Sequence, residues 1–179
     1  MLLLLGDGTQ VPVTELPGRG PWTFLIVGPA PAGADPTARF LTRSGRAVVP
    51  DLRGRPGWGE PPDGPGFLEL VDDLDQVRTR AGLGRPVLVG VGDLAPVALR
   101  AAVDQPWAWR ALVLAPPAAQ PAAAAELAEL DPPVLLLDAA SWERLGEGEG
   151  SVAGAVERLL GRLGGGPGWS GIAPDAPPR

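Results

Sequence analysis

Carboxylates are the side chains with which this chain could carry out acid–base or nucleophilic chemistry. The 179 residues contain no His, no Cys and no Tyr, and all 15 basic residues are Arg. These absences exclude a Ser–His–Asp or Cys–His catalytic site, a Schiff-base Lys, a zinc site built from His and Cys, and a disulfide. Among the side chains present, only a carboxyl with a strongly raised pKa could titrate near neutral pH.

Four carboxylates are the candidates for such chemistry. Asp93 and Asp138 each follow an apolar run, and Glu147 and Glu149 lie in a Gly-Glu-Gly-Glu-Gly stretch. Two carboxyls whose pKa values are pushed apart could act as acid and base if they converge in one cleft. The competing structural interpretation makes Asp93 a helix N-cap, Asp138 a turn residue at a strand end, and the two Glu solvated loop residues.

Short apolar runs alternate with amphipathic segments, and these are the elements that must position the carboxylates. The apolar runs predict strands over residues 22–27, 46–50, 86–90, 110–114 and 133–137. The amphipathic segments predict helices over residues 35–44, 67–82, 94–102, 121–130 and 151–163, with Ser151 as the cap of the last one. Two further runs, 2–5 and 10–14, flank a Gly-Asp-Gly-Thr turn and predict a β-hairpin. The pattern therefore predicts an α/β fold, a three-layer sandwich whose mostly parallel sheet of about seven strands carries an antiparallel N-terminal hairpin.

The predicted domain covers residues 1–163. Residues 164–179 are rich in Gly and Pro, and we expect a disordered tail there. The formal net charge is −6 and no Lys is present, so we expect no nucleic-acid partner. The acidic cluster Asp72, Asp73 and Asp75 is expected to be a solvated helix face rather than a metal site, and no cofactor is expected.

No apolar run approaches the length that a membrane-spanning helix needs, so no membrane association is expected. The first five residues lack the basic start and the long apolar core of a signal peptide. The absence of Cys fits a reducing compartment, and we expect a cytoplasmic protein.

Two segments at predicted strand ends resemble motifs of the α/β-hydrolase family. Residues 48–54 (Val-Val-Pro-Asp-Leu-Arg-Gly), followed by Gly-Trp-Gly-Glu at 57–60, are similar to the family's Asp-x-Arg-Gly-x-Gly-x-Ser loop. Residues 88–100 align without gaps to the family's Leu-Val-Gly-His-Ser-Met-Gly-Gly-x-Val-Ala-Leu-Arg, which holds the nucleophile elbow. The resemblance covers residues 1–163 and implies an α/β-hydrolase-like fold.

The departures from the family pattern fall on the catalytic positions. In the gapless alignment Gly92 occupies the nucleophile position, and the elbow reads Gly-Val-Gly-Asp-Leu over residues 90–94. Gly28 and Pro29 stand where the family has its oxyanion loop, and Asp138 loosely matches the catalytic acid. Residues 146–150, with the two Glu, stand in place of the loop that carries the family's His. The family's lid is reduced to a short Ala-rich stretch. Little room lies between Asp138 and Ser151 for a helix and an eighth strand, so a truncated sheet without a lid domain is expected.

A second alignment, shifted by one residue, places Asp93 at the elbow. Family members with Asp at this position attack alkyl carbons or epoxides and form an ester intermediate. This alignment needs a one-residue deletion, and the hydrolysis of such an ester normally uses a His that is absent here.

Five residues are expected to line a pocket at the carboxyl ends of the strands: Asp51, Trp58, Val91, Asp93 and Trp142. Ligands of parallel sheets bind at this end, and aromatic side chains suit an apolar site or a partner surface. Packing within the core or the loops is the alternative role for both Trp.

Three functions follow as hypotheses. The leading one is an α/β-hydrolase-like protein that has lost catalysis and binds a small apolar ligand or a protein partner. The second is an active ester, epoxide or haloalkane hydrolase that uses carboxylates such as Asp93 without a His. The third is a structural module that self-associates, as a possible homodimer, through an unpaired sheet edge or the final helix.

Overall fold

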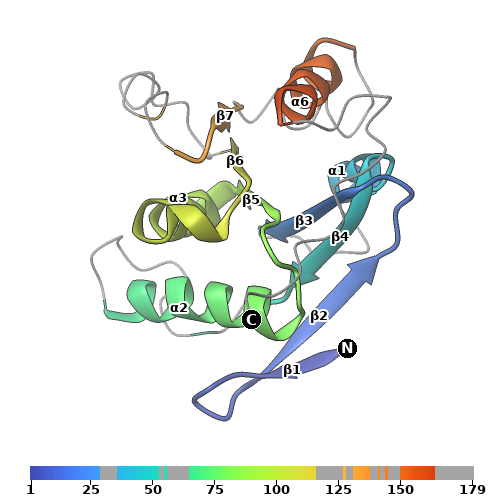
Figure 1. Ribbon diagram of the computed structural model, residues 1–179. Coiled ribbons are helices and arrows are strands. Elements are labelled where there is room, and N and C mark those ends of the chain that lie inside the picture. Colours follow the sequence, from blue (N-terminus) through green and yellow to red (C-terminus); the bar gives the residue numbers. More distant parts are fainter. Residues whose placement is uncertain are drawn as a thin grey trace, which may run out of the picture.

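The alternating segments form a seven-stranded sheet with helices on both faces (Figure 1). The computed structural model describes residues 1–28, 36–52, 55, 65–115, 127, 131–137, 141, 144 and 150–163. The strands are β1 (Leu2–Leu4), β2 (Gln10–Leu16), β3 (Trp22–Val27), β4 (Gly45–Pro50), β5 (Val87–Val91), β6 (Ala111–Ala115) and β7 (Val134–Leu136). The described helices are α1 (Pro36–Leu41), α2 (Pro65–Arg80), α3 (Ala95–Asp104) and α6 (Gly150–Arg162), with short 3-10 turns η1 (Gly92–Leu94) and η2 (Pro106–Ala108).

The sheet is mostly parallel, and its strand order is β1-β2-β4-β3-β5-β6-β7. β1 pairs with β2 and β2 with β4 in antiparallel fashion, while every other neighbouring pair is parallel. The predicted fold class and the N-terminal hairpin are therefore confirmed.

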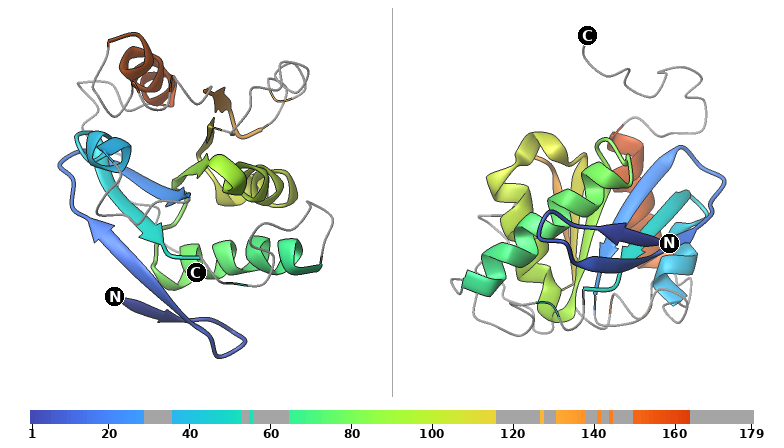
Figure 2. Two further views of the ribbon diagram at one scale, coloured as in Figure 1. Left: turned by 180° about the vertical axis from the view of Figure 1, so that it is seen from behind. Right: turned by 90° about the horizontal axis from the view of Figure 1, so that it is seen from below.

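The sheet divides the apolar residues into two clusters, one on each face. Along β3, Leu25 and Val27 point to one side, and Phe24 and Ile26 point to the other, as the two-residue period of a strand requires. Helices α2 and α3 cover the first face, and α1 and α6 cover the second (Figures 1 and 2). The molecule is thus a three-layer sandwich in which strands such as β3 are buried on both faces, which explains their continuous apolar runs.

Two helix boundaries differ from the predictions. The helix predicted over residues 35–44 ends at Leu41, and its last turn closes with hydrogen bonds from Arg43 N–H to Phe40 O and from Ser44 N–H to Leu41 O. The last helix begins at Gly150, so Ser151 lies inside it and is not its cap. Caps and termini depend on the exact path of the entering chain, which hydrophobic periodicity does not encode.

Two predicted segments lie largely or wholly outside the described residues. In the Ala-rich stretch 121–130 only Leu127 is described, and it is buried against the α2–α3 side of the sheet. The predicted tail 164–179 is outside the described part of the chain. Within the described ranges, no helix has both the length and the apolar character needed to cross a membrane.

Candidate functional site

The strand order reverses direction at β3, and this reversal marks where a ligand crevice is expected. β4 pairs with one side of β3, and β5 pairs with the other. In open α/β sheets, ligands bind beyond the carboxyl ends of the two strands at such a point. Here those ends are Val27, followed by Gly28, and Val91, followed by Gly92.

Gly28 and Val91 lie against each other at this point. A Cβ built on Gly28 would be 3.1 Å from the Val91 Cβ, which is closer than an ordinary van der Waals contact. The structure therefore brings together the two predicted strand-end segments, one from the loop after β3 and one from the elbow after β5. Both residues are partly exposed.

The elbow after β5 is a sharp strand–turn–helix connection. Val91 is extended, with φ −123° and ψ 137°, whereas Gly92 has a φ of +60° and begins η1, which leads directly into α3. An L-residue with a side chain is disfavoured in this left-handed region, and Gly is not. The geometry thus favours the gapless alignment, because no described non-Gly residue, Asp93 included, has a positive φ.

Asp93 is exposed and does not cap a helix, so the N-cap prediction was wrong. The cap of η1 is Val91 and that of α3 is Leu94, and neither makes a side-chain hydrogen bond to the helix. The reason is that the chain turns at Gly92 and enters η1 at once, which places Asp93 inside the first turn. A carboxylate there is still favourably placed toward the positive end of the helix dipole.

Asp51 follows β4 at the same end of the sheet. Its backbone N–H donates to the carbonyl of Pro12 on β2 at 2.8 Å, and the next residue, Leu52, is buried. The structure therefore places Asp51 at the carboxyl end of β4, as predicted.

The other predicted site residues lie outside the described part of the chain. These are Pro29, Trp58, Asp138, Trp142, Glu147 and Glu149. Their roles, and the convergence of the four carboxylates, stay predictions. Among the described residues, no group of three or more Asp and Glu side chains is placed to hold a metal ion.

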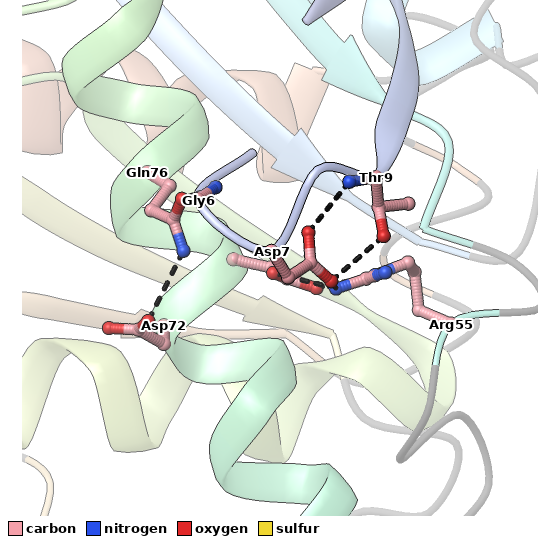
Figure 3. A network of polar contacts seen from close by, with 7 residues as sticks. Gly6, Asp7, Thr9, Arg55, Asp72 and Gln76 are labelled. Atoms are coloured by element: carbon pink, nitrogen blue, oxygen red, sulfur yellow. Dashed lines mark hydrogen bonds and ion pairs between the residues drawn. The ribbon is translucent and has the colours of Figure 1, made fainter. Parts of the chain in front are cut away.

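A polar network near the end of β4 was not predicted (Figure 3). Arg55 donates through Nε to Asp73 Oδ2 at 2.7 Å and through Nη2 to Asp73 Oδ1 at 3.0 Å. The same Nη2 also donates to Asp7 Oδ2 in the turn between β1 and β2, at 2.9 Å. Asp73 is only 4% exposed, so the expectation of a solvated acidic face was wrong for this residue. The reason is the guanidinium, which pairs the buried charge.

A second contact joins the same turn to α2. Gly6 N–H donates to Gln76 Oε1 at 2.5 Å, and Gln76 Nε2 donates to Asp72 Oδ2 at 3.2 Å (Figure 3). Gly6 and Gln76 are 70 positions apart in the sequence. No local sequence pattern predicts these contacts, because Gly6 takes part through its backbone N–H, and Gln76 and Asp72 are ordinary polar residues of a helix.

The turn itself is ordered by Asp7. Its carboxylate accepts hydrogen bonds from the Thr9 N–H and the Thr9 hydroxyl, both at 2.8 Å. These bonds, followed by the bond from Arg55, lower the pKa of Asp7 from its ordinary value of 3.8 to about 2. On the other side of the pair, the bond to Asp73 raises the pKa of Arg55 above its ordinary range.

Solved structures provide the comparison with known proteins. No protein-family model and no curated protein sequence matches the chain. An α/β hydrolase from Sphaerobacter thermophilus is similar at 27% identity and a TM-score of 0.52, over 67% of this chain and 46% of that one. An epoxide hydrolase from Vigna radiata is similar at 26% identity and a TM-score of 0.51, over 64% and 38% of the two chains.

An esterase from Exiguobacterium antarcticum shares the fold at 19% identity and a TM-score of 0.50, over 64% of this chain and 44% of that one. In each of these three comparisons, the match spans less than half the length of the similar protein. The chain is therefore similar to proteins of the α/β-hydrolase fold and shares that fold over about two thirds of its length.

Proposed function

We propose that this chain is an α/β-hydrolase-like protein that acts by binding rather than by hydrolysis. The observation that carries the proposal is Gly92, which stands at the elbow with a φ of +60° and no side chain. The elbow backbone is present, while the atom that attacks the substrate in the family is missing.

The chemistry of the chain supports this proposal. Nucleophilic hydrolysis of the family type needs an attacking side-chain atom and a His that accepts its proton. Gly92 supplies no attacking atom, and the chain contains no His. Water attack driven by a lone carboxylate would need a strongly raised pKa.

The site geometry favours a small apolar ligand as the molecule that the protein binds. Gly28 and the apolar side chain of Val91 lie close together at the reversal point of the strand order, and both are partly exposed at the carboxyl edge of the sheet. Apolar walls with few polar groups are typical of small-molecule sites. The occupant proposed here is therefore an uncharged, mainly apolar molecule.

A protein partner is the second form of the proposal. β1 ends the sheet, and Leu2 and Leu4 on it are 62% and 54% exposed. An uncharged edge strand of this kind can accept a strand from another chain, including a second copy. Light scattering over a range of concentrations separates the two forms, because a homodimer gives a mass that rises with concentration and a ligand-binding monomer does not.

A carboxylate-dependent hydrolase is the alternative function. The observation in its favour is that Asp93 is exposed and directly follows the elbow glycine. A carboxylate here could attack an epoxide or an alkyl halide. The missing step is the hydrolysis of the resulting ester, for which the chain has no His.

A substrate panel tests catalysis directly. Chromogenic short-chain esters, epoxides and haloalkanes are incubated with the parent, with Asp93→Asn and with the matched control Asp104→Asn, which changes an exposed carboxylate at the other end of α3. We expect no turnover above the buffer rate in any of the three. Turnover in the parent and in Asp104→Asn that is lost in Asp93→Asn would replace the binding proposal with the carboxylate hydrolase.

A binding titration tests the site. The uncharged fluorescent probe N-phenyl-1-naphthylamine is titrated into the parent, into Val91→Asp and into Val103→Asp, whose side chain is 48% exposed on α3. We expect Val91→Asp to weaken binding by at least tenfold and Val103→Asp to leave it unchanged, with circular dichroism confirming that both variants are folded. Equal binding by all three proteins would contradict a site at Val91.

A further inference from the structure

Arg55 holds three separate parts of the chain together. Its guanidinium joins Asp73 of α2 and Asp7 of the β1–β2 turn, while its own backbone belongs to the connection after β4. The Arg55 side chain is 11% exposed, so both ion pairs are made by one largely buried cation. Figure 3 shows the Asp7 side of this arrangement, with Thr9 and Arg55 both beside the Asp7 carboxylate.

The backbone that leads to Arg55 starts at the candidate site. Asp51 is bonded through its N–H to Pro12 O at 2.8 Å, Leu52 is 1% exposed in the core, and the Arg55 N–H donates to Leu52 O at 3.2 Å. The N-terminal hairpin therefore holds this connection at two points: the Pro12 carbonyl on β2 and the Asp7 carboxylate in the turn.

We propose that Arg55 and Asp7 form a clasp through which the β1–β2 turn positions Asp51 and Leu52 at the edge of the candidate site. Arg55 is thus a positioning residue, and the turn, though remote in sequence, controls how firmly the end of β4 is held. This coupling is a property of the fold and does not depend on the proposed binding function.

The two ion pairs of Arg55 have different exposures, and this makes the clasp asymmetric. The Asp73 side chain is 5% exposed and accepts two hydrogen bonds, whereas the Asp7 side chain is 50% exposed and accepts one from Arg55. Water and salt screen the exposed pair far more than the buried one. The ion pair between Arg55 and Asp7 therefore breaks first, while the ion pair with Asp73 still holds Arg55 against α2.

Amide hydrogen exchange on the full chain tests the clasp. The reporters are the N–H groups of Asp51 and Arg55, and the amides of β5 and β6 give the global reference. The key variant is Asp7→Asn, because the Asn oxygen can still accept the bond from Thr9 N–H while the negative charge facing Arg55 is gone. We expect exchange at the two reporters to rise about two- to fivefold, the range typical of an exposed ion pair, with β5 and β6 unchanged.

Matched variants separate the clasp from general stability. Thr9→Val removes the Thr9 hydroxyl bond to Asp7 but keeps the Arg55 contact, so we expect little change at the reporters. Asp104→Asn breaks the exposed 2.7 Å pair with Arg100 elsewhere on the molecule and should also leave them unchanged. Asp73→Asn removes the negative charge of the buried ion pair with Arg55. This variant should raise amide exchange throughout α2 and lower the melting temperature.

Salt provides an independent readout. Raising the salt concentration to 1 M shortens the screening length to about 3 Å, so exchange at Asp51 should rise in the parent and stay constant in Asp7→Asn. The proposal is overturned if Asp7→Asn leaves the reporters unchanged. It is equally overturned if exchange rises by the same factor at the reporters and in β5 and β6, because the pair would then act only on global stability.

Discussion

Single residues decide what the elbow of this protein can do. Gly92 adopts a left-handed backbone and contributes no side chain, whereas the exposed Asp93 beside it contributes a carboxylate from inside the first helical turn. The backbone geometry and the chemistry are thus separable at this site. The turn depends on Gly92, whereas the carboxylate belongs to Asp93.

Replacing Gly92 by Ala should destabilise the fold. A Cβ in the left-handed region costs about 1–2 kcal/mol, so we expect the free energy of unfolding in urea to fall by this amount. The control is Gly161→Ala in α6, where nothing lies within 4 Å of the added Cβ. This control should gain about 0.5–1 kcal/mol from higher helix propensity. A stable Gly92→Ala variant would show that the positive φ is not required.

The Asp7 carboxylate should make stability depend on acid pH. Its pKa is lowered in the folded protein to about 2 from 3.8, so the folded state favours the ionised form. The stabilisation is fully present above the ordinary pKa and is lost as the pH falls from about 4 to about 2. We expect the melting temperature of Asp7→Asn to fall less than that of the parent over this interval. If the melting temperatures of the two proteins fall by the same amount over this pH range, the lowered pKa of Asp7 is contradicted.

At the scale of elements, close packing of β5 against α3 holds the elbow in place. A Cβ on Gly90 would lie 2.5 Å from the Ala98 Cβ and 3.0 Å from the Ala95 Cα. Trp109 fixes the other end of α3, where its ring N–H donates to Ala101 O at 3.0 Å. The small residues at positions 90, 95 and 98 therefore set how closely the helix approaches the sheet.

Gly90→Ala should force β5 and α3 apart. Overpacking of this kind costs about 1–3 kcal/mol, and chemical denaturation should show this loss. The matched control is Gly154→Ala in α6, where the added Cβ would meet only the flexible end of Arg158 at 3.2 Å. If the two variants are equally stable, the close approach in the structure is not a constraint.

At the scale of the whole molecule, the sheet contributes residues to two apolar clusters, one on each of its faces. Trp109 belongs to the cluster under α2 and α3, and Trp22 belongs to the cluster under α1 and α6. Because neighbouring residues of each central strand face opposite clusters, neither cluster can be lost while the sheet stays intact. The two layers should therefore unfold together.

Coincident unfolding transitions would demonstrate this cooperativity. We expect tryptophan fluorescence and far-ultraviolet circular dichroism to give the same denaturant midpoint. Trp107→Phe serves as the control, since the Trp107 side chain is 68% exposed and its loss should leave the midpoint unchanged. A fluorescence transition that precedes the loss of circular dichroism would show that one layer separates first.

The sequence by itself determined the hairpin, the five strands that follow it, and the chemical repertoire of the chain. Strand and helix periods are local patterns, and the absence of His and the Gly at position 92 follow from composition and alignment. Only the tertiary structure decided that Asp73 is buried against Arg55, that Asp93 lies past the cap position, and that Gly28 meets Val91. These features arise from contacts between distant segments or from the exact path of the backbone, which no local pattern encodes.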